Sequence, residues 1–110
     1  MILFLLYFSV IQEHNEVRKS YDLRTFVVDS QLMEWADAHA QEMARKEGIF
    51  HSNRGVFENV AVGKLTVKGV MKLWMDSPGH RRNILNPKLT RIGAAVYKYK
   101  GQYYWCVMML

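Results

Sequence analysis

The side chains best suited to chemistry in this chain are two histidines and one carboxylate in polar, loop-like surroundings. His51, Glu58 and His80 each lie beside Asn, Ser, Gly or Pro residues rather than within an apolar repeat, and binding and catalytic groups concentrate on loops held by a rigid scaffold. Two imidazoles and a carboxylate with open positions are typical of catalytic zinc sites. If the three segments converge, we expect a small polar cleft able to hold zinc, another divalent ion or an acidic ligand.

The remaining histidines and the single cysteine favour structural roles. His39 falls on the apolar stripe of a predicted helix, where we expect a hydrogen-bonded core histidine. His14 lies in the polar part of an earlier helix, which favours a structural hydrogen bond or plain exposure over ligation. Cys106 has no second cysteine to pair with and stands in an apolar run, so we expect a buried, inert thiol rather than a nucleophile.

The composition indicates one folded domain over residues 1–110. Half of the residues are hydrophobic and 13% are aromatic, which excludes a disordered or fibrous chain. The net charge of +5 is scattered, with its densest patch at Arg81-Arg82. No helix-turn-helix, zinc-finger or aromatic-basic strand motif occurs, so we expect a solvated basic surface and no specific nucleic-acid binding.

Residues 1–11 are almost wholly apolar and allow two interpretations. The segment has the length of a signal-peptide core but no basic leader and no small-x-small cleavage site. It is also too short to span a bilayer, which takes about 20 residues. Apolar residues recur at helical spacing, and we favour the start of a core helix that runs to about Ser20 over a truncated or degenerate export signal. The residues with this spacing are Leu3, Leu6, Val10, Val17 and Tyr21.

Three helices follow from periodicity and capping signals. The first covers about residues 4–20. The second follows Asp29-Ser30, carries an apolar stripe from Leu32 to Ala44, and is expected to stop at Gly48. The third covers about residues 66–76 and ends before Pro78-Gly79, after which residues 80–85 can form a short helical turn.

One short strand is expected between the first two helices, and a hairpin is expected after the last. Residues 25–28 form a short extended segment, and residues 91–99 and 102–110 flank Lys100-Gly101 as a hairpin. The last run is apolar on both faces, which predicts a sheet covered on both sides. The fold class is therefore α+β, with helices packed on a small antiparallel sheet.

Several short segments follow one another in a recognisable order. They are HNEVR at 14–18, an L-x-x-x-A-x-x-x-A helix at 32–44, HS at 51–52, ENVA at 58–61, WMDSPGHRRNIL at 74–85, and IG and YW at 92–93 and 104–105. In this order and spacing the chain resembles the CAP superfamily of cysteine-rich secretory proteins, antigen 5 and pathogenesis-related proteins. It is most similar to the short bacterial members that lack disulfides.

The resemblance implies a three-layer α-β-α sandwich and a central cleft, which two histidines and two glutamates line in many relatives. The matching positions here are His51, Glu58 and His80, whereas Ser77 stands in place of the second glutamate. Asp76 is adjacent but points about 100° away around a helix. Phe57 replaces a usual glycine. The resemblance thus implies a three-residue polar cleft, bordered by Ser77 and Asn59, in a mostly secreted family.

We expect a non-catalytic, extracytoplasmic and monomeric binding module, because no activated nucleophile is evident. Its cleft at His51, Glu58 and His80 would bind a divalent metal or a small polar or peptide ligand, with His51 and His80 as the metal ligands.

Four alternatives stay open. In a zinc-dependent, peptidase-like hydrolase, Glu58 would act as general base on metal-bound water. In a serine-type hydrolase, Ser77 would act with His80. Lipid or sterol binding would need an apolar groove between helices. In the fourth, the cluster has a purely structural role: Glu58 and Asn59 cap backbone groups, His51 and His80 hydrogen-bond to them, and the network holds the loops together.

Overall fold

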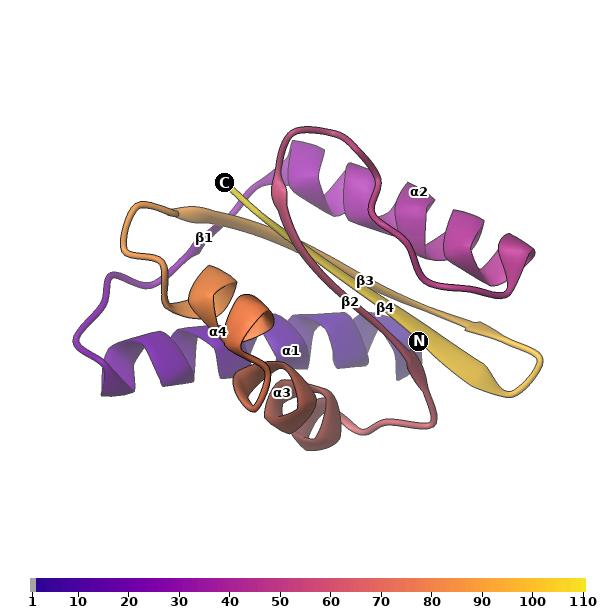
Figure 1. Ribbon diagram of the computed structural model, residues 1–110, viewed down its shortest axis with the longest axis horizontal. Coiled ribbons are helices and arrows are strands. Elements are labelled where there is room, and N and C mark those ends of the chain that lie inside the picture. The colour runs from indigo at the N-terminus through magenta and orange to yellow at the C-terminus, as the bar shows by residue number, and fades with distance from the viewer. Residues whose placement is uncertain (1) are drawn as a thin grey trace.

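A sheet in the strand order β1-β3-β4-β2 organises the molecule (Figure 1). The computed structural model describes residues 2–110, with the side chains of residues 2–4 left out. β3 (Arg91–Tyr99) and β4 (Gln102–Met109) form the predicted hairpin, and positive φ angles at Lys100 and Gly101, 51° and 78°, allow its tight turn. β2 (Phe57–Gly63) pairs antiparallel with β4, and the short β1 (Val27–Val28) pairs parallel with β3.

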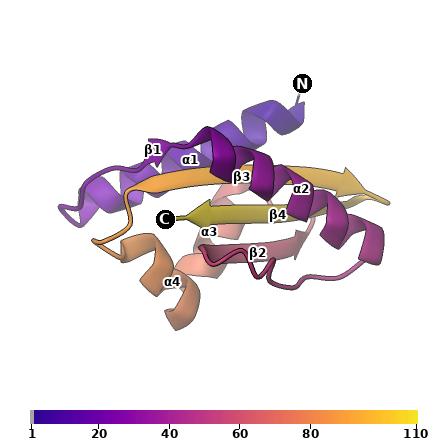
Figure 2. The ribbon, with the colours of Figure 1, turned by 90° about the horizontal axis from the view of Figure 1, so that it is seen from above.

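Helices cover both faces of the sheet, which confirms the predicted three-layer α+β architecture (Figures 1 and 2). α2 (Ser30–Lys46) lies on one face. The other face is covered by α1 (Ile2–Ser20), α3 (Val67–Met75) and α4 (Pro78–Leu85). None of the helices within residues 2–110 combines the length and the apolar character needed to cross a membrane.

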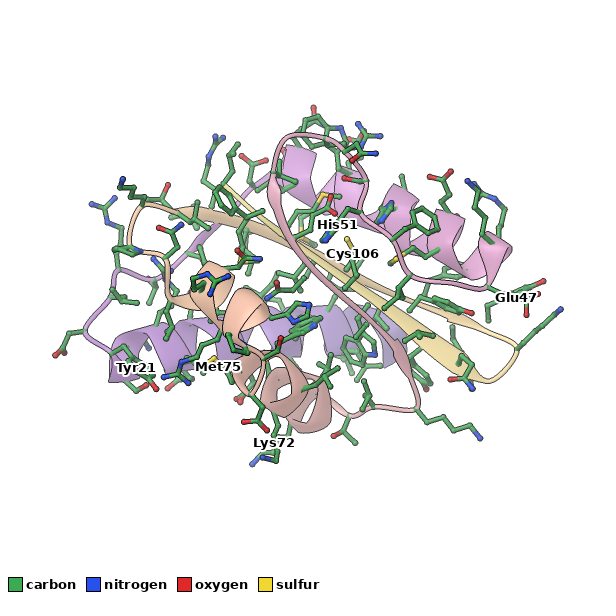
Figure 3. All side chains as sticks on the ribbon, in the orientation of Figure 1. Tyr21, Glu47, His51, Lys72, Met75 and Cys106 are labelled. Atoms are coloured by element: carbon green, nitrogen blue, oxygen red, sulfur yellow. The ribbon has the colours of Figure 1, made fainter. Side chains whose placement is uncertain are left out.

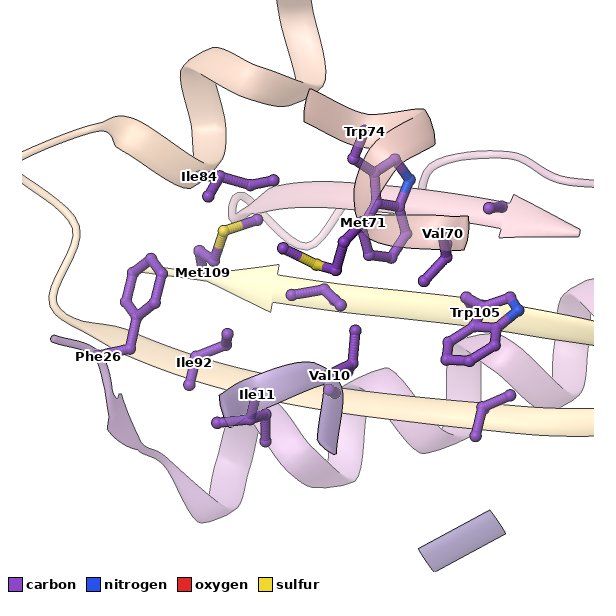
Figure 4. Close-up of a cluster of buried hydrophobic side chains, with 14 of the residues drawn as sticks. Val10, Ile11, Phe26, Val70, Met71, Trp74, Ile84, Ile92, Trp105 and Met109 are labelled. Carbon is purple, nitrogen blue, oxygen red and sulfur yellow. The ribbon is translucent and has the colours of Figure 1, made fainter. Parts of the chain in front are cut away.

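Each face of the sheet carries its own apolar core, because successive side chains of a strand point to opposite sides. On β4, Cys106 and Met108 face α2, whereas Trp105 and Met109 face the other helices. Figure 4 shows the second of these cores, in which Trp74 of α3 lies over the strands. The expectation that the last apolar run is covered on both sides is confirmed.

The first helix is confirmed and begins earlier than expected, at Ile2. Val10 is buried, and Leu6 and Val17 pack against the core. Met1 and the Leu3 side chain lie outside the described part of the chain. Tyr21 was expected on the same stripe, but it follows the end of the helix and is 47% exposed, so this prediction was wrong.

Two segments differ from the expectation in kind or extent. Residues 57–63, whose Glu58-Asn59 pair suggested a loop, form strand β2. The expected helical turn at residues 80–85 is a full helix, α4, that begins at Pro78, where a missing N–H costs nothing. The second helix ends at Lys46, and Glu47 rather than Gly48 takes the left-handed conformation, with φ of 52°.

The buried guanidinium of Arg18 joins α1 to the end of α4. The Arg18 side chain is fully buried and stacks on Phe26, with Cζ 4.1 Å from the ring centroid. Its nitrogens donate hydrogen bonds of 2.7–3.0 Å to the backbone carbonyls of Arg24, Ile84, Asn86 and Leu89. These bonds fix the connection between α4 and β3 against α1.

We expect Arg18→Lys to lower the free energy of unfolding by about 3 kcal/mol or more, because one ammonium cannot replace the planar fork and leaves buried carbonyls without donors. Urea denaturation measures the change. Arg24→Lys, on an exposed side chain, is the control and should shift stability by less than about 0.5 kcal/mol. Equal losses in the two variants would contradict this role.

Gly93 of β3 lets the backbone of α2 approach the sheet directly. A Cβ at this position would lie 2.2 Å from the carbonyl carbon of Leu32 and 2.4 Å from the nitrogen of Met33. Both atoms belong to backbone, which cannot rotate away as a side chain can. The spacing between α2 and β3 therefore depends on glycine at this position.

We expect Gly93→Ala to destabilise the protein by about 1–3 kcal/mol or more through overpacking. Gly48→Ala is a matched control, because its Cβ would come no closer than 3.9 Å to the nearest neighbouring atom. Chemical denaturation of both variants checks the prediction. A Gly93→Ala variant as stable as the control would show that α2 can move away at little cost.

Candidate functional site

A cleft of about 480 Å³ lies along the outer strand β2. Residues 60–62 of β2 form its floor, and residues 49–51 of the loop after α2 form one wall. The opposite wall consists of Leu73 from α3, Ser77 from the connection, and His80 from α4. His51 and His80 thus face one cavity from opposite layers of the fold; Figure 3 labels His51 in the region between α2 and the sheet.

Glu58 holds the loop that carries His51. The Glu58 side chain is buried, and its Oε1 accepts hydrogen bonds from the Ser52 backbone N–H and from Nδ1 of His51, both at 3.0 Å. Its Oε2 accepts a hydrogen bond from the Ser52 hydroxyl. Both oxygens of the carboxylate therefore bind the loop.

These contacts set the charge of Glu58 and the tautomer of His51. Burial acts to raise the pKa of Glu58, but the hydrogen bonds from Ser52 and His51 outweigh it and lower the pKa below its usual value. Because an ionised carboxylate only accepts, Nδ1 of His51 carries the hydrogen. Nε2 of His51 is then the ring nitrogen left for a ligand.

Ser77 orients His80 within the first turn of α4. Ser77 occupies the N-cap position, yet its hydroxyl makes no capping bond and instead lies 2.8 Å from Nδ1 of His80. Burial, followed by the nearby charge of His51, lowers the pKa of His80. His80 is therefore also tied through Nδ1, which leaves its Nε2 for the cleft.

Asn59 fixes α4 against the sheet from the other side of β2. Its Nδ2 donates to the His80 carbonyl at 3.1 Å, and its Oδ1 accepts from Nδ2 of Asn83 at 2.9 Å. The same Asn83 nitrogen lies 3.3 Å from the Glu58 carbonyl. Adjacent residues of one strand thus position both walls of the cleft.

The structure therefore divides the predicted site residues into two groups. His51, His80 and Ser77 line the cleft, whereas Glu58 and Asn59 lie behind it and position the others. Asp76 is directed elsewhere, with its carboxylate 2.9 Å from Nζ of Lys72.

Sequence reasoning missed two supporting residues and the apolar rim. Asn83 lies one helical turn after His80, a spacing that places the two on one side of α4. Ser52 is adjacent to His51. The exposed apolar side chains of the rim, which had no periodic signal, are Ile49, Val62 and Leu73.

A metal centre with three protein ligands does not fit these side chains. Within residues 2–110, no three or more His, Cys, Asp or Glu side chains are grouped so that they could hold a metal ion. Both oxygens of Glu58 are engaged by Ser52 and His51. Zinc binding stays a prediction, and the groups available for it are the Nε2 atoms of His51 and His80.

The remaining chemical side chains take structural roles. Nε2 of His39 lies 2.6 Å from the Phe50 carbonyl, and Cys106 is buried, so both predictions are confirmed. His14 makes the expected structural bond, from Nδ1 to the Val10 carbonyl at 2.7 Å. It is fully buried rather than exposed, and burial lowers its pKa to about 4.

Comparison with known proteins finds one matching family model and one related bacterial sequence. The family model described as the cysteine-rich secretory protein family, CAP, matches residues 11–110. The uncharacterized protein YkwD of Bacillus subtilis is 34% identical over 102 residues, covering 77% of this chain and 40% of that protein. The chain thus spans less than half the length of this relative.

Solved structures share the fold at low sequence identity. An extracellular protein containing an SCP domain from Bacillus anthracis matches with a TM-score of 0.86 and 21% identity, covering 98% of this chain and 41% of that one. An outer surface protein from Borrelia burgdorferi matches with a TM-score of 0.80 and 20% identity, covering 91% of this chain and 88% of that one.

The lowered pKa of Glu58 predicts an acid-sensitive contribution to stability. Such a carboxyl stabilises the fold above its unfolded pKa of about 4.3, and that contribution is lost as the pH falls through the lower folded value. We expect Glu58→Gln, which cannot titrate, to lose less stability than the wild type as the pH falls below ~5.

At pH ~7 the same variant should be less stable by about 1–3 kcal/mol, because a Gln amide places donors opposite the Ser52 donors. Urea denaturation across a pH series measures both effects, with Glu34→Gln as an exposed control. A pH profile of Glu58→Gln parallel to that of the wild type would contradict the assignment.

Proposed function

Because the chain belongs to the cysteine-rich secretory protein (CAP) family, and a fold does not fix one activity, we propose its function from the cleft. We infer that the protein is a binding module for a small polar or peptide ligand. The observation that carries the proposal is the meeting of an apolar rim and two imidazoles in one cavity. Ile49, Val62 and Leu73 are 48%, 38% and 49% exposed around the same cavity that His51 and His80 line. Clustered exposed apolar side chains mark ligand or protein contacts.

The imidazole pair suits a ligand group that both donates and accepts hydrogen bonds. In its neutral form, with the hydrogen on Nδ1, His51 offers Nε2 as an acceptor. The Ser77 hydroxyl can donate to or accept from Nδ1 of His80, so Nε2 of His80 can take either role. An amide or a hydroxyl group meets both requirements.

The contacts of the polar residues favour binding over catalysis. Both oxygens of Glu58 already accept hydrogen bonds from the loop, and Glu58 does not line the cleft, which weakens the zinc-hydrolase alternative. The contact of 2.8 Å between Ser77 and His80 is the one feature that favours a serine hydrolase. However, within residues 2–110 no carboxylate is paired with His80 to orient it, as the third member of a triad would.

An extracytoplasmic location forms part of the proposal. It is supported by two structural neighbours, one described as extracellular and the other as an outer surface protein.

The lipid-binding alternative has a separate place in the fold. A second cleft, of about 520 Å³, lies between α1, the start of α3 and the β3-β4 hairpin. Leu6, Leu65 and Tyr103 line it together with Lys64 and Lys98. Ligand mapping can therefore separate the two alternatives by position.

We expect N-acetyl-leucine amide, which carries an apolar side chain between two amides, to bind saturably in the first cleft. Amide chemical-shift changes in ¹⁵N-labelled protein should centre on His51, Val62, Leu73 and His80. His80→Ala should weaken binding about fivefold, the equivalent of one neutral hydrogen bond of about 1 kcal/mol.

Leu73→Ser should weaken binding by a similar factor, whereas Leu5→Ser, on an exposed leucine of α1 outside the cleft, should bind as the wild type does. Shifts around Leu65 and Tyr103 with oleate, and none in the first cleft with either probe, would overturn the proposal in favour of lipid binding. Turnover of p-nitrophenyl acetate abolished by Ser77→Ala would overturn the non-catalytic assignment.

A further inference from the structure

The hydrogen-bond pattern of the sheet shows which backbone groups of β2 face outward. Arg91 and Leu110 exchange both backbone hydrogen bonds, at 2.9 and 3.0 Å, so the backbone N–H and C=O of Leu110 point toward β3. Because these groups alternate in direction along β4, the backbone N–H and C=O of Met109 point toward β2, where the partner residue is Phe57. By the same alternation, Asn59, Ala61 and Gly63 bond to β4, and the residues whose N–H and C=O groups point away from the sheet are Glu58, Val60 and Val62.

Two of these outward carbonyls already have partners. The Glu58 carbonyl accepts from Nδ2 of Asn83 at 3.3 Å, and the Val60 carbonyl accepts from Nε1 of Trp74 at 3.2 Å. Both contacts agree independently with the outward direction derived from the ladder. In the described part of the chain, the N–H of Val60 and both backbone groups of Val62 have no partner in the fold.

These open groups lie in the floor of the cleft, since residues 60–62 line it. Proteins usually protect an exposed sheet edge with charges, proline or a covering element. Here Asn83 of α4 covers the edge at Glu58 and Trp74 of α3 covers it at the Val60 carbonyl. The edge is left open toward Val62, which is 38% exposed. The opening is recessed between the loop at Ile49 and the wall at Leu73.

We propose that the ligand is an extended polypeptide segment of another protein, which adds to β2 as a further strand through the N–H of Val60 and both backbone groups of Val62. This inference rests on the proposed binding function and names its ligand class. The free N–H and C=O groups match a peptide backbone, and they lie in a recess between two walls rather than on a flat, exposed edge. Main-chain bonds give affinity in this mode, and pockets for alternate side chains give specificity.

The two faces of β2 define those pockets. Val60 belongs to the core on the α2 side, and Ala61 belongs to the core on the α3 side. Side chains of the added strand would alternate in the same way. One set would contact Ile49 and Phe50, and the other would contact Leu73 and His80.

Val62→Pro tests the backbone contact directly. Proline removes the outward N–H of Val62 without removing a bond to β4, and proline is tolerated on an edge strand in this orientation. The probe is acetyl-Thr-Val-Leu-Val-Thr-amide, titrated into ¹⁵N-labelled protein. We expect Val62→Pro to weaken binding at least about tenfold, whereas Val62→Thr, which keeps the backbone and the shape, binds within about twofold of the wild type.

N-methylation of the probe supplies a second test on wild-type protein, which decides the question even if Val62→Pro does not fold. Methylation of the backbone nitrogens whose N–H groups face β2 should abolish binding, and methylation of the intervening nitrogens should not. The two sets alternate because only every second N–H of a strand points toward the neighbouring strand. Equal effects at all positions, or equal affinity of Val62→Pro and the wild type, would overturn strand addition.

The outcomes separate this inference from the function on which it rests. If N-acetyl-leucine amide binds but the pentapeptide shows no alternation, the binding cleft stands and strand addition fails. If neither probe binds, both fail. Pairing of two copies through β2 would appear as a dimer in analytical ultracentrifugation without peptide, and would also overturn the proposal.

Discussion

The geometry of this molecule depends on a buried positive charge that is stabilised by backbone carbonyl dipoles. Arg18 donates to carbonyls at the end of α4 and in the loop before β3, where a helix terminus leaves acceptors unpaired and carries partial negative charge. One side chain thus satisfies several buried acceptors and holds three segments together. The position of α4, and with it His80, follows from this contact.

The cleft arises because β2 is both an outer strand and a boundary between two layers. Its alternation sends the Glu58 side chain toward the loop of His51 and the Asn59 side chain toward α4. Each of these buried polar groups is satisfied by the wall that it holds, as burial of polar groups requires. A polar network therefore fixes the two walls, while the floor keeps open backbone groups.

The sequence allowed the periodic elements to be predicted but not the contacts that define the site. The stripe from Leu32 to Ala44 and the Lys100-Gly101 turn are local signals, and both elements were found. β2 was missed because Glu58-Asn59 has low strand propensity, and only tertiary partners make its burial favourable. The order of motifs indicated that His51 and His80 converge. It did not show that Glu58 supports the loop rather than lining the cleft.

All residues that line the cleft lie between Ile49 and His80, whereas α1, α2, β3 and β4 come from the rest of the chain. The residues of the candidate cleft are therefore contiguous in sequence, and the same segment also supplies core residues such as Val60 and Trp74. Substitutions at Ile49, Val62 and Leu73 change exposed side chains of the cleft and leave the contacts of Arg18 and Gly93 in place. In evolution, or in grafting experiments, these exposed positions could diversify while the buried framework is inherited unchanged.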